Sequence, residues 1–436
     1  MKKFLVIMLA ALMLISLVAC TQNPGDKPAD KPQGKVFNIH AWNEEFKGFF
    51  EKYYTVPEGV TVNWIITPSD NGAYQQKLDE ALLNQANAAD DDKIDMFLAE
   101  ADYIGKYVDS DYTMDVTSFG FKNAPTQYEY TIKAASDANG VCKGVSFQCC
   151  PAGVIYRKSI AMDVLGTDKP EEVQAAIDTW EKFDAVAAQA KEKGYYMTAS
   201  FAETFRAFSN NCTSPWVDAN NNLQFDPQIN AWMDQTEKYI QNGYTLTAGV
   251  WDAEKTDQMF ATGKTMCFFG PAWYYNFCMT NAMDAENGCV GDWCIVKGPQ
   301  AYFWGGTWLL AATGSDNTEM LKDIFETFTV NTEVLNKMVK DDNQYVNNTD
   351  VVKAFAEDPN YGNTAILDGQ NDIAVFYGLA KDIKWENHTN YDQLLNEGLQ
   401  NKLQEFYKGS VDKETAMNNF YQYVKETYPT IVLPNN

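Results

Sequence analysis

The fold is decided by three neighbouring segments, VTVNWIIT (60–67), AYQQKLDEALLNQANA (73–88) and IDMFL (94–98). The first and third are short, apolar and rich in β-branched or aromatic residues, which favours strands. The middle segment carries Leu78 and Leu82 at helical spacing. Strand, helix and strand in this order predict a parallel sheet flanked by helices, which is the core of an α/β fold.

The same alternation continues on both sides of this stretch. VFNIHA (36–41) favours another strand before it, and a second series begins after residue 179. That series predicts strands at 195–200, 265–269, 293–296 and 308–312, and helices after residue 179, over 227–242, 252–262 and 317–329, and in the last part of the chain at 394–424. A chain of 436 residues exceeds the size at which one core stops growing, so we expect two α/β lobes.

Three of these helices have recognisable start signals. Thr179 can cap the first helix, and Asp226 followed by Pro227 is an N-cap with a proline at the first helical position. Asp316 and Glu319 match the spacing of a capping box before the apolar residues of the next helix.

The N-terminus carries a secretory signal. Lys2 and Lys3 precede an apolar run over residues 4–17, and small residues follow up to Cys20. The Cys after Leu-x-Ala resembles a bacterial lipoprotein signal, which implies cleavage after residue 19 and a lipid on the Cys20 thiol. The apolar run is shorter than the roughly 20 residues that span a membrane. Residues 20–35 are rich in Pro and Lys and predict a flexible tether, so we expect a lipid-anchored protein outside the cytoplasm, at the extracellular face or in the periplasm.

The composition excludes several classes of partner. The formal net charge is −25, so the surface repels phosphate backbones and nucleic acid is not expected. Eight cysteines remain after Cys20 and allow 105 pairings, and no paired Cys-x-x-Cys ladder suggests zinc. Only His40 and His388 exist, and the acidic turn at residues 218–229 lacks the glycine and final glutamate of a calcium loop. We expect no metal and no cofactor.

A candidate site follows from the ends of the predicted strands. In open α/β sheets, ligands bind beyond the carboxyl ends of the strands. The positions there are aromatic or polar: Trp42, Asn43, Glu44, Asp70, Glu100, Asp102, Trp273 and Tyr274. A pyranose lies flat on an indole ring and its hydroxyls bond to carboxylates and amides. We therefore expect a sugar site, with Trp42 and Trp273 as stacking platforms.

Four further residues are candidates from elsewhere in the chain. Arg206 and Trp216 are polar and aromatic candidates from the second lobe. Trp304 and Trp308 are equally compatible with the site and with the core, as is Trp251.

The chain also resembles a known family, the extracellular solute-binding proteins of bacterial ABC importers in their carbohydrate-binding, maltose-binding-like branch. The segments that carry the resemblance are ANG (138–140), GVIYRK (153–158), MFATGKTM (259–266), GPAW (270–273), GDW (291–293), GP (298–299) and GGTW (305–308). The resemblance covers nearly the whole mature chain, and in the family the aromatic after Gly-Pro packs on sugar, which supports Trp273.

The resemblance implies a two-lobed periplasmic-binding-protein-like fold of type II, with parallel-dominated sheets and three hinge crossings near 147–151, 296–299 and 329–331. It places residues 36–148 with 298–330 in an N-terminal lobe, and residues 149–297 with 331–436 in a C-terminal lobe. A monomer that closes on an oligosaccharide and delivers it to ABC transporter permease subunits is the expected function, without enzymatic activity.

Two other functions remain open at the level of the sequence. A surface glycoside hydrolase needs only two suitably placed carboxylates, and 59 acidic residues always provide such a pair. A binding protein for peptides or polyamines would also suit an acidic crevice.

Overall fold

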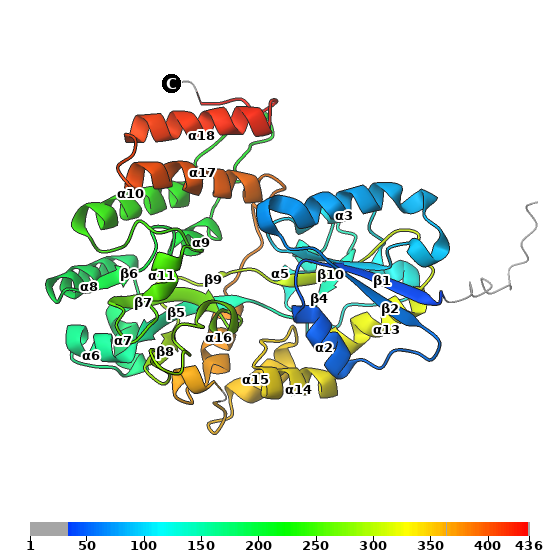
Figure 1. Cartoon of the computed structure of the whole chain (residues 1–436), viewed down its shortest axis with the longest axis horizontal. Coiled ribbons are helices and arrows are strands. Elements are labelled where there is room, and N and C mark those ends of the chain that lie inside the picture. The colour runs from blue at the N-terminus through cyan, green and yellow to red at the C-terminus, as the bar shows by residue number, and fades with distance from the viewer. Residues whose placement is uncertain (1–33, 363, 435–436) are drawn as a thin grey trace, which may run out of the picture.

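Two lobes lie side by side in the computed structural model, which describes residues 34–362 and 364–434. Figure 1 shows the first lobe mainly in blue and cyan with one yellow helix, the second mainly in green with an orange helix, and the last two helices above the second lobe. Each lobe is a sheet packed between helices. The predicted α/β fold in two lobes is confirmed. The predicted signal peptide, Cys20 and almost all of the tether lie outside the described residues.

The first lobe is built on a five-stranded sheet in the order β2-β1-β3-β10-β4. β1 (Val36–Ala41), β2 (Thr61–Ile66) and β3 (Met96–Glu100) are the strands predicted from the N-terminal segments, and they are parallel. β10 (Thr307–Ala311) lies antiparallel between β3 and β4 (Gly144–Ser146). The carboxyl ends of β1 and β3 and the start of β10 therefore meet at one edge.

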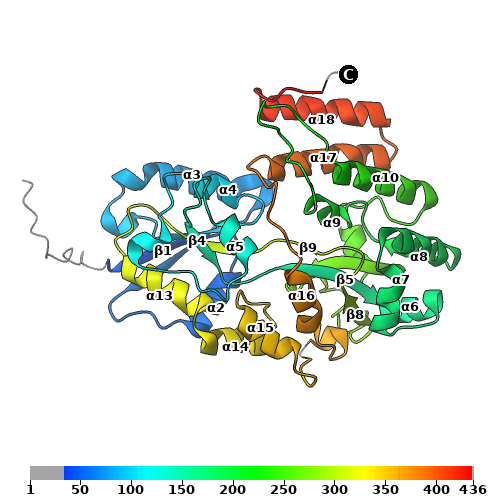
Figure 2. The same cartoon turned by 180° about the vertical axis from the view of Figure 1, so that it is seen from behind.

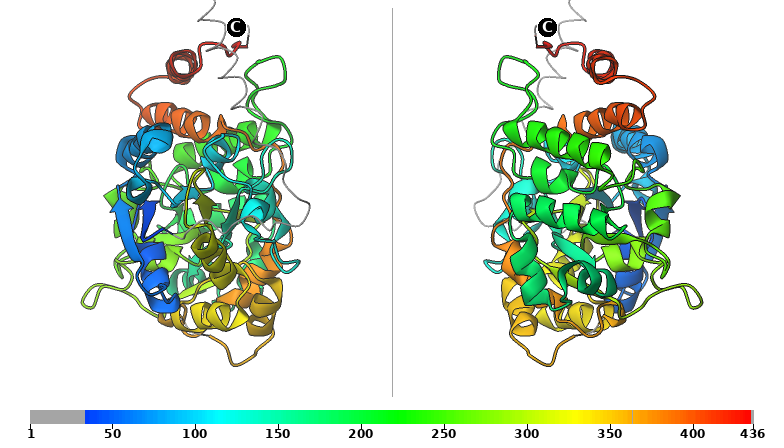
Figure 3. Two further views of the ribbon diagram at one scale, coloured as in Figure 1. Left: turned by 90° about the vertical axis from the view of Figure 1, so that its right-hand side faces the viewer. Right: turned by 90° about the vertical axis from the view of Figure 1, so that its left-hand side faces the viewer.

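Helices cover both faces of this sheet. α3 (Ala73–Asn84) and α4 (Ile104–Val108) bury apolar residues with β3 and β10 on one face. α2 (Glu45–Tyr53) and α13 (Thr318–Thr329) cover the other. Figure 3, which looks along the long axis, shows these layers end-on. Burial on both faces explains why β3 is an unbroken apolar run rather than an alternating one.

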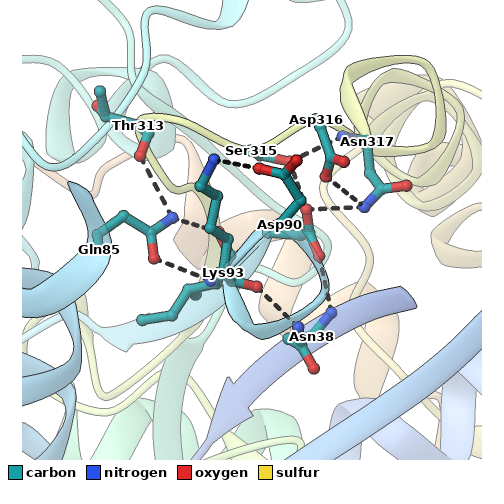
Figure 4. A network of polar contacts seen from close by, with 10 residues as sticks. Asn38, Gln85, Asp90, Lys93, Thr313, Ser315, Asp316 and Asn317 are labelled. Atoms are coloured by element: carbon teal, nitrogen blue, oxygen red, sulfur yellow. Dashed lines mark hydrogen bonds and ion pairs between the residues drawn. The ribbon is translucent and has the colours of Figure 1, made fainter. Parts of the chain in front are cut away.

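A buried polar network fixes the edge of the first sheet that lies away from the carboxyl ends of β1 and β3. Asp95 accepts hydrogen bonds from Asn38 N (2.8 Å), Ser315 Oγ (2.5 Å) and Asn317 Nδ2 (2.9 Å). Gln85 joins the same region to Thr313 through its side-chain amide. Figure 4 shows these contacts between segments that are far apart in the sequence. The network holds the starts of β1 and β3 against the end of β10.

The second lobe is built on the sheet β6-β7-β5-β8. These strands are β5 (Pro151–Arg157), β6 (Tyr196–Thr198), β7 (Thr265–Pro271) and β8 (Trp293–Val296), and β9 (Tyr302–Phe303) also pairs with β5. Among the described residues, three strand pairings are parallel and five antiparallel. The predicted parallel-dominated sheets are therefore wrong in this detail. Strands that enter a sheet from the other lobe, such as β5 and β10, pair antiparallel with their neighbours. An antiparallel pair does not need the helical crossover connection that joins parallel neighbours.

Two of the three predicted helix starts are confirmed. Thr179 Oγ1 accepts from Lys182 N at the start of α8 (Trp180–Glu192). Asp226 caps α10 (Pro227–Asn242), which ends at Gly243. The predicted capping box at Asp316 is wrong, because α13 begins one residue later and its N-cap makes no side-chain bond to the helix.

The chain passes between the sheets at short segments. Residues 147–150 link β4 to β5, and residues 304–306 link β9 to β10. The second passage lies after the predicted 296–299, because residues 302–303 first pair with β5. Gly305 and Gly306 have φ of +74° and +119°, a turn that favours glycine. Residues 330–331 join α13 to α14 (Thr332–Asp342), and the predicted lobe boundaries remain a proposal.

The C-terminal part returns across the molecule. In Figure 2, the segment after α16 (Asp372–Ala380) runs between the lobes to α17 (Asp392–Tyr407). α17 and α18 (Lys413–Thr427) form a second core with α10. The remaining helices are α5 (Glu129–Ala134), α6 (Lys158–Leu165), α7 (Pro170–Ile177), α9 (Phe205–Ser209), α11 (Ala253–Asp257), α12 (Tyr274–Cys278) and α15 (Thr349–Ala356), with 3-10 turns at Asp70–Gly72, Gln85–Asn87, Asp90–Asp92, Val116–Phe119 and Ala365–Leu367. The helix predicted at 252–262 is shorter than expected, since α11 ends at Asp257.

Three chemical features complete the description. All eight cysteines in the described residues are free thiols. Within residues 34–362 and 364–434, no cluster of His, Cys, Asp and Glu has the arrangement of a metal site. None of the described helices is long and apolar enough to cross a membrane.

Candidate binding cleft between the lobes

A cleft of about 620 Å³ opens between the two lobes at the carboxyl ends of β1 and β3. Segments from both lobes, from two of the crossing segments and from α17 line it. The lining residues are Trp42, Asn43, Glu45, Glu100, Asp102, Gln148, Phe201, Ala202, Glu203, Phe205, Arg206, Gly249, Val250, Trp251, Asp252, Trp273, Phe277, Trp304, Gly305, Gly306, Thr307, Glu397, Gln400, Asn401 and Gln404. The position agrees with the rule for ligands in open α/β sheets.

The loop after β1 provides the first wall. Trp42 packs edge-on against Tyr74 and leaves part of its indole at the cleft. Asn43 turns the chain into α2, because its Oδ1 accepts from Glu45 N (3.1 Å). Glu45 lines the cleft, and its Oε2 accepts from Gln148 Nε2 in the first crossing segment (3.3 Å).

The loop after β3 adds two carboxyls. Glu100 Oε2 accepts from Asp102 N (2.7 Å), which folds the loop tightly. Asp102 reaches across to the second lobe and accepts from both terminal nitrogens of Arg206 on α9, each at 2.5 Å. A bidentate pair of this kind is short and directional. It joins the two lobes inside the cleft.

Burial without a counter-ion shifts the cleft carboxyls toward their neutral forms. Burial raises the pKa of Glu45 to about 7, against a smaller opposing effect of the Gln148 hydrogen bond. Burial and the neighbouring charge of Asp102 raise the pKa of Glu100. Burial also disfavours the charge of Asp102, but Arg206 outweighs it and holds the pKa of Asp102 below its usual value.

Three indoles form the aromatic part of the second wall. Trp304 lies at the centre, with its ring 5.2 Å from Trp273 and 5.6 Å from Trp251. Trp273 Nε1 donates to the Trp304 carbonyl (3.1 Å), which fixes the orientation of the Trp273 ring. The Trp251 side chain is 71% exposed, so a ligand can cover it without rearranging the core.

A polar stripe on α17 closes the cleft at one end. Glu397, Gln400, Asn401 and Gln404 follow one another at helical spacing and line the cleft. α17 also contacts the first lobe, because Gln75 Nε2 of α3 donates to Gln393 Oε1 (3.3 Å). Figure 1 shows α17 above the second lobe, with one end reaching toward α3.

The structure brings seven of the twelve predicted site residues into this cleft. They are Trp42, Asn43, Glu100, Asp102, Arg206, Trp273 and Trp304. Two predicted carboxylates of the first lobe do not line it. Glu44 is largely exposed and pairs with Lys47 (3.2 Å), because it precedes the first turn of α2 and points away. Asp70 is exposed in a 3-10 turn after β2.

Three predicted aromatic residues are also placed elsewhere. Trp308 is buried beneath α4 and its Nε1 donates to Thr131 O (2.9 Å), because it faces the helical layer rather than the cleft. Trp216 packs in the core formed with α17 and α18 and donates to Asn396. Tyr274 is fully buried and packs on Gly270, where a Cβ would come within 2.4 Å of its ring.

Several lining residues were not among the predicted site residues. Glu45 is adjacent to Glu44, and only the start of α2 decides which of the two reaches the cleft. In the sequence, the polar residues of α17 lie opposite its leucines. A solvent-exposed helix face has the same pattern, so the sequence does not show that this face lines a cleft. Trp251 was compatible with core or site, and its position in the turn before α11 decides for the cleft.

This arrangement can hold a polar ligand with flat apolar faces. Indole faces pack on apolar ring faces, and carboxylate and amide oxygens accept hydrogen bonds from hydroxyl groups. The pair formed by Asp102 and Arg206 supplies charge of both signs in the wall of the cleft.

A family model and solved structures resemble this chain. Residues 50–364 match the family described as "Bacterial extracellular solute-binding protein". No curated protein sequence matches the chain. A solved extracellular solute-binding protein of family 1 superposes with a TM-score of 0.75 at 16% identity, covering 90% of this chain and 99% of that one.

Two further solved structures were determined with sugars. An ABC transporter-associated binding protein from B. animalis subsp. lactis, in complex with β-1,6-galactobiose, has a TM-score of 0.67 at 16% identity, covering 92% of this chain and 100% of that one. The galacto-N-biose-/lacto-N-biose I-binding protein of an ABC transporter from Bifidobacterium longum, in complex with lacto-N-biose, has a TM-score of 0.68 at 14% identity, covering 91% and 98%. At these identities the likeness concerns the fold.

Proposed function

The chain belongs to the bacterial extracellular solute-binding proteins, and from that membership we propose that it is the receptor for an oligosaccharide that it delivers to an ABC transporter. The family is one of binding proteins rather than enzymes, and it acts outside the cytoplasm. The observation that carries the proposal is the cleft itself. Three indoles face a wall of carboxylate and amide groups across the gap between two lobes.

The ligand is proposed to hold the lobes together. Trp42 and Glu45 come from the first lobe, and Trp251 and Trp273 from the second. A ligand between them gains its full set of contacts only when both walls are close, so binding stabilises the closed form. Sugar-bound relatives of the same fold support the choice of ligand class.

Two other functions can be distinguished from the sugar receptor by experiment. A glycoside hydrolase would use two cleft carboxyls, one of them protonated, as Glu45 is below about pH 7. A polyamine or peptide receptor would rely mainly on the acidic groups, whereas a sugar uses both the acidic groups and the flat apolar faces of the indoles. The indole-lined wall favours the sugar.

The test is a titration of purified protein with defined oligosaccharides, spermidine and short peptides, followed by tryptophan fluorescence and calorimetry. Binding of an oligosaccharide that is recovered intact supports the proposal. Recovery of shortened sugars supports the hydrolase instead. A response to spermidine or to peptides alone, with no response to any sugar, rejects the sugar receptor.

Lipid anchoring is a separate part of the proposal. Cys20 is proposed to carry the lipid, and residues 21–35 to separate the receptor from the membrane. Expression of the full chain and of Cys20→Ser in a bacterial host supplied with labelled palmitate tests this. We expect label in the membrane fraction with the parent chain and none with the variant. Equal labelling of both would exclude Cys20 as the acceptor.

A further inference from the structure

The cleft has a surplus of carboxyl groups. Six acidic side chains line it, namely Glu45, Glu100, Asp102, Glu203, Asp252 and Glu397. Arg206 is the only Lys, Arg or His that lines the cleft within the described part of the chain. The cleft is therefore more acidic than a neutral ligand requires.

Only two of these carboxyls have a cationic partner. Asp102 uses both oxygens on Arg206, and Glu203 lies 3.4 Å from Lys255 Nζ, a buried side chain next to the cleft. The other four form no ion pair within 4 Å among the described residues. They are Glu45, Glu100, Asp252 and Glu397.

Glu203 provides an independent indication of a missing donor. The residue is 5% exposed and lines the cleft. Its Oε1 accepts from Phe269 N (3.0 Å) and lies near Lys255, but its Oε2 has no hydrogen-bond partner among the described residues. A buried carboxyl oxygen without a donor is costly, and Lys255 lies near only the other oxygen of Glu203.

The aromatic wall is suited to the same kind of ligand. Trp251, Trp273 and Trp304 present ring faces that attract cations as well as apolar sugar faces. Arg206 lies with its guanidinium carbon 5.9 Å from the Trp304 ring. Carboxyls and indoles together therefore match a ring that carries a positive charge.

We propose that the cleft selects oligosaccharides built from amino sugars with a free, protonated amine over their neutral and anionic counterparts. This inference rests on the proposed function and adds the charge of the ligand to it. An ammonium group supplies the counter-charge that the four unpaired carboxyls lack. An anionic sugar is repelled by each of these carboxyls that is ionised.

The ionisation of the cleft gives the proposal a specific signature. Burial holds part of the Glu45 population protonated near neutral pH. A bound ammonium lowers the pKa of nearby carboxyls, so protons leave the protein on binding. A neutral oligosaccharide has no such effect. At about pH 5.5, where the amine is already protonated, proton release therefore separates charge recognition from simple contact.

The experiment uses matched sets of trisaccharides on two backbones, β-1,4-linked gluco and α-1,4-linked galacto. Each set contains the free-amine, the N-acetylated, the neutral and the uronic acid form, and spermidine is titrated alongside. Calorimetry in two buffers of different ionisation enthalpy, at about pH 5.5 and about pH 7, gives affinity and proton release. We expect the free-amine form to bind roughly tenfold tighter than the neutral form of the same backbone, with proton release.

A pair of variants on one helix tests the assignment. Glu45→Gln keeps the shape of the protonated side chain and should lower the preference for the amine about tenfold, with smaller proton release. Glu51→Gln changes an exposed residue of the same helix α2 and should leave both unchanged.

Three results would overturn the inference. If a neutral or uronic form binds as tightly as the free-amine form, charge selection is wrong while the sugar receptor stands. If spermidine binds more tightly than every sugar, the cleft recognises cations without sugar. If the folded protein binds no oligosaccharide of either backbone, the proposed function fails as well.

Discussion

At the scale of single residues, the side chains that line the cleft differ widely in how far they are buried. Trp304 and Glu203 are buried and belong to the framework, whereas the Trp251 side chain lies 71% exposed at the cleft. Exposed apolar side chains contribute little to folding and are free to serve a ligand. Residues such as Trp251 therefore test binding without disturbing the fold.

Trp251→Ala should weaken binding of the best oligosaccharide from the screen by about 1 to 2 kcal/mol, or roughly tenfold in Kd, because the ligand loses one ring face. The melting temperature should stay within about 1 °C of the parent. Leu83→Ala is the control, since Leu83 is 65% exposed on α3 and does not line the cleft. Calorimetry and thermal melts measure both effects, and unchanged affinity in Trp251→Ala would remove this indole from the site.

Glu45 gives a pH-dependent prediction for the ligand-free protein. Because burial raises its pKa from 4.5 to about 7, the folded state binds more protons than the unfolded state in this range. Its contribution to stability is therefore lost as the pH rises from about 4.5 to about 7. Glu45→Gln stays neutral and should melt a few degrees higher than the parent at about pH 8, with little difference at about pH 4.5. An equal difference at both pH values would show that the charge of Glu45 is not responsible.

At the scale of elements, the two capped helices of the second lobe differ in what their caps hold. Thr179 Oγ1 accepts one backbone N–H at the start of α8. Asp226 accepts from Gln228 N at the start of α10, and also from the backbone and hydroxyl groups of Thr213 and Ser214. Asp226 therefore anchors the preceding loop as well as the helix.

Asp226→Ala should lower the free energy of unfolding by about 2 to 4 kcal/mol, because it leaves several donors unsatisfied at a buried position. Thr179→Ala is the matched comparison, and it should cost about 1 kcal/mol because a single bond is lost. Urea unfolding at neutral pH measures the two values. Equal losses in the two variants would contradict the anchoring role of Asp226.

At the scale of the whole molecule, the two lobes are joined by chain crossings and by the ion pair between Asp102 and Arg206. The pair lies inside the cleft and belongs to neither lobe alone. Two lobes linked by short segments move as hinged bodies, and contacts across the gap bias them toward closure. The pair therefore contributes to the balance between open and closed forms.

The double variant Asp102→Asn with Arg206→Gln should shift this balance roughly tenfold toward the open form, because one charge-assisted contact between the lobes is removed. Small-angle scattering of the ligand-free protein should then give a larger radius of gyration than the parent. Lys337→Gln is the control, since it breaks an ion pair within α14. Identical scattering from the double variant and the parent would show that the pair does not hold the lobes.

Local signals in the sequence were sufficient to predict the α/β class, the two lobes and most strands, because apolar periodicity and helix caps depend on neighbouring residues. It also located the strand ends where Trp42, Glu100 and Trp273 line the cleft. Position directly after a strand was enough for Trp42 and Glu100, since the carboxyl ends of β1 and β3 meet at one edge, whereas Trp273 follows β7 of the second sheet.

Tertiary structure decided the rest of the site. Whether Glu44 or Glu45 faces the cleft depends on where α2 begins, and the role of α17 depends on a chain return over almost the whole molecule. The pairing of Asp102 with Arg206 and the antiparallel strands arise from contacts between distant segments. Sequence patterns report which face of an element is apolar, but only packing between lobes determines which polar face meets solvent and which meets a ligand.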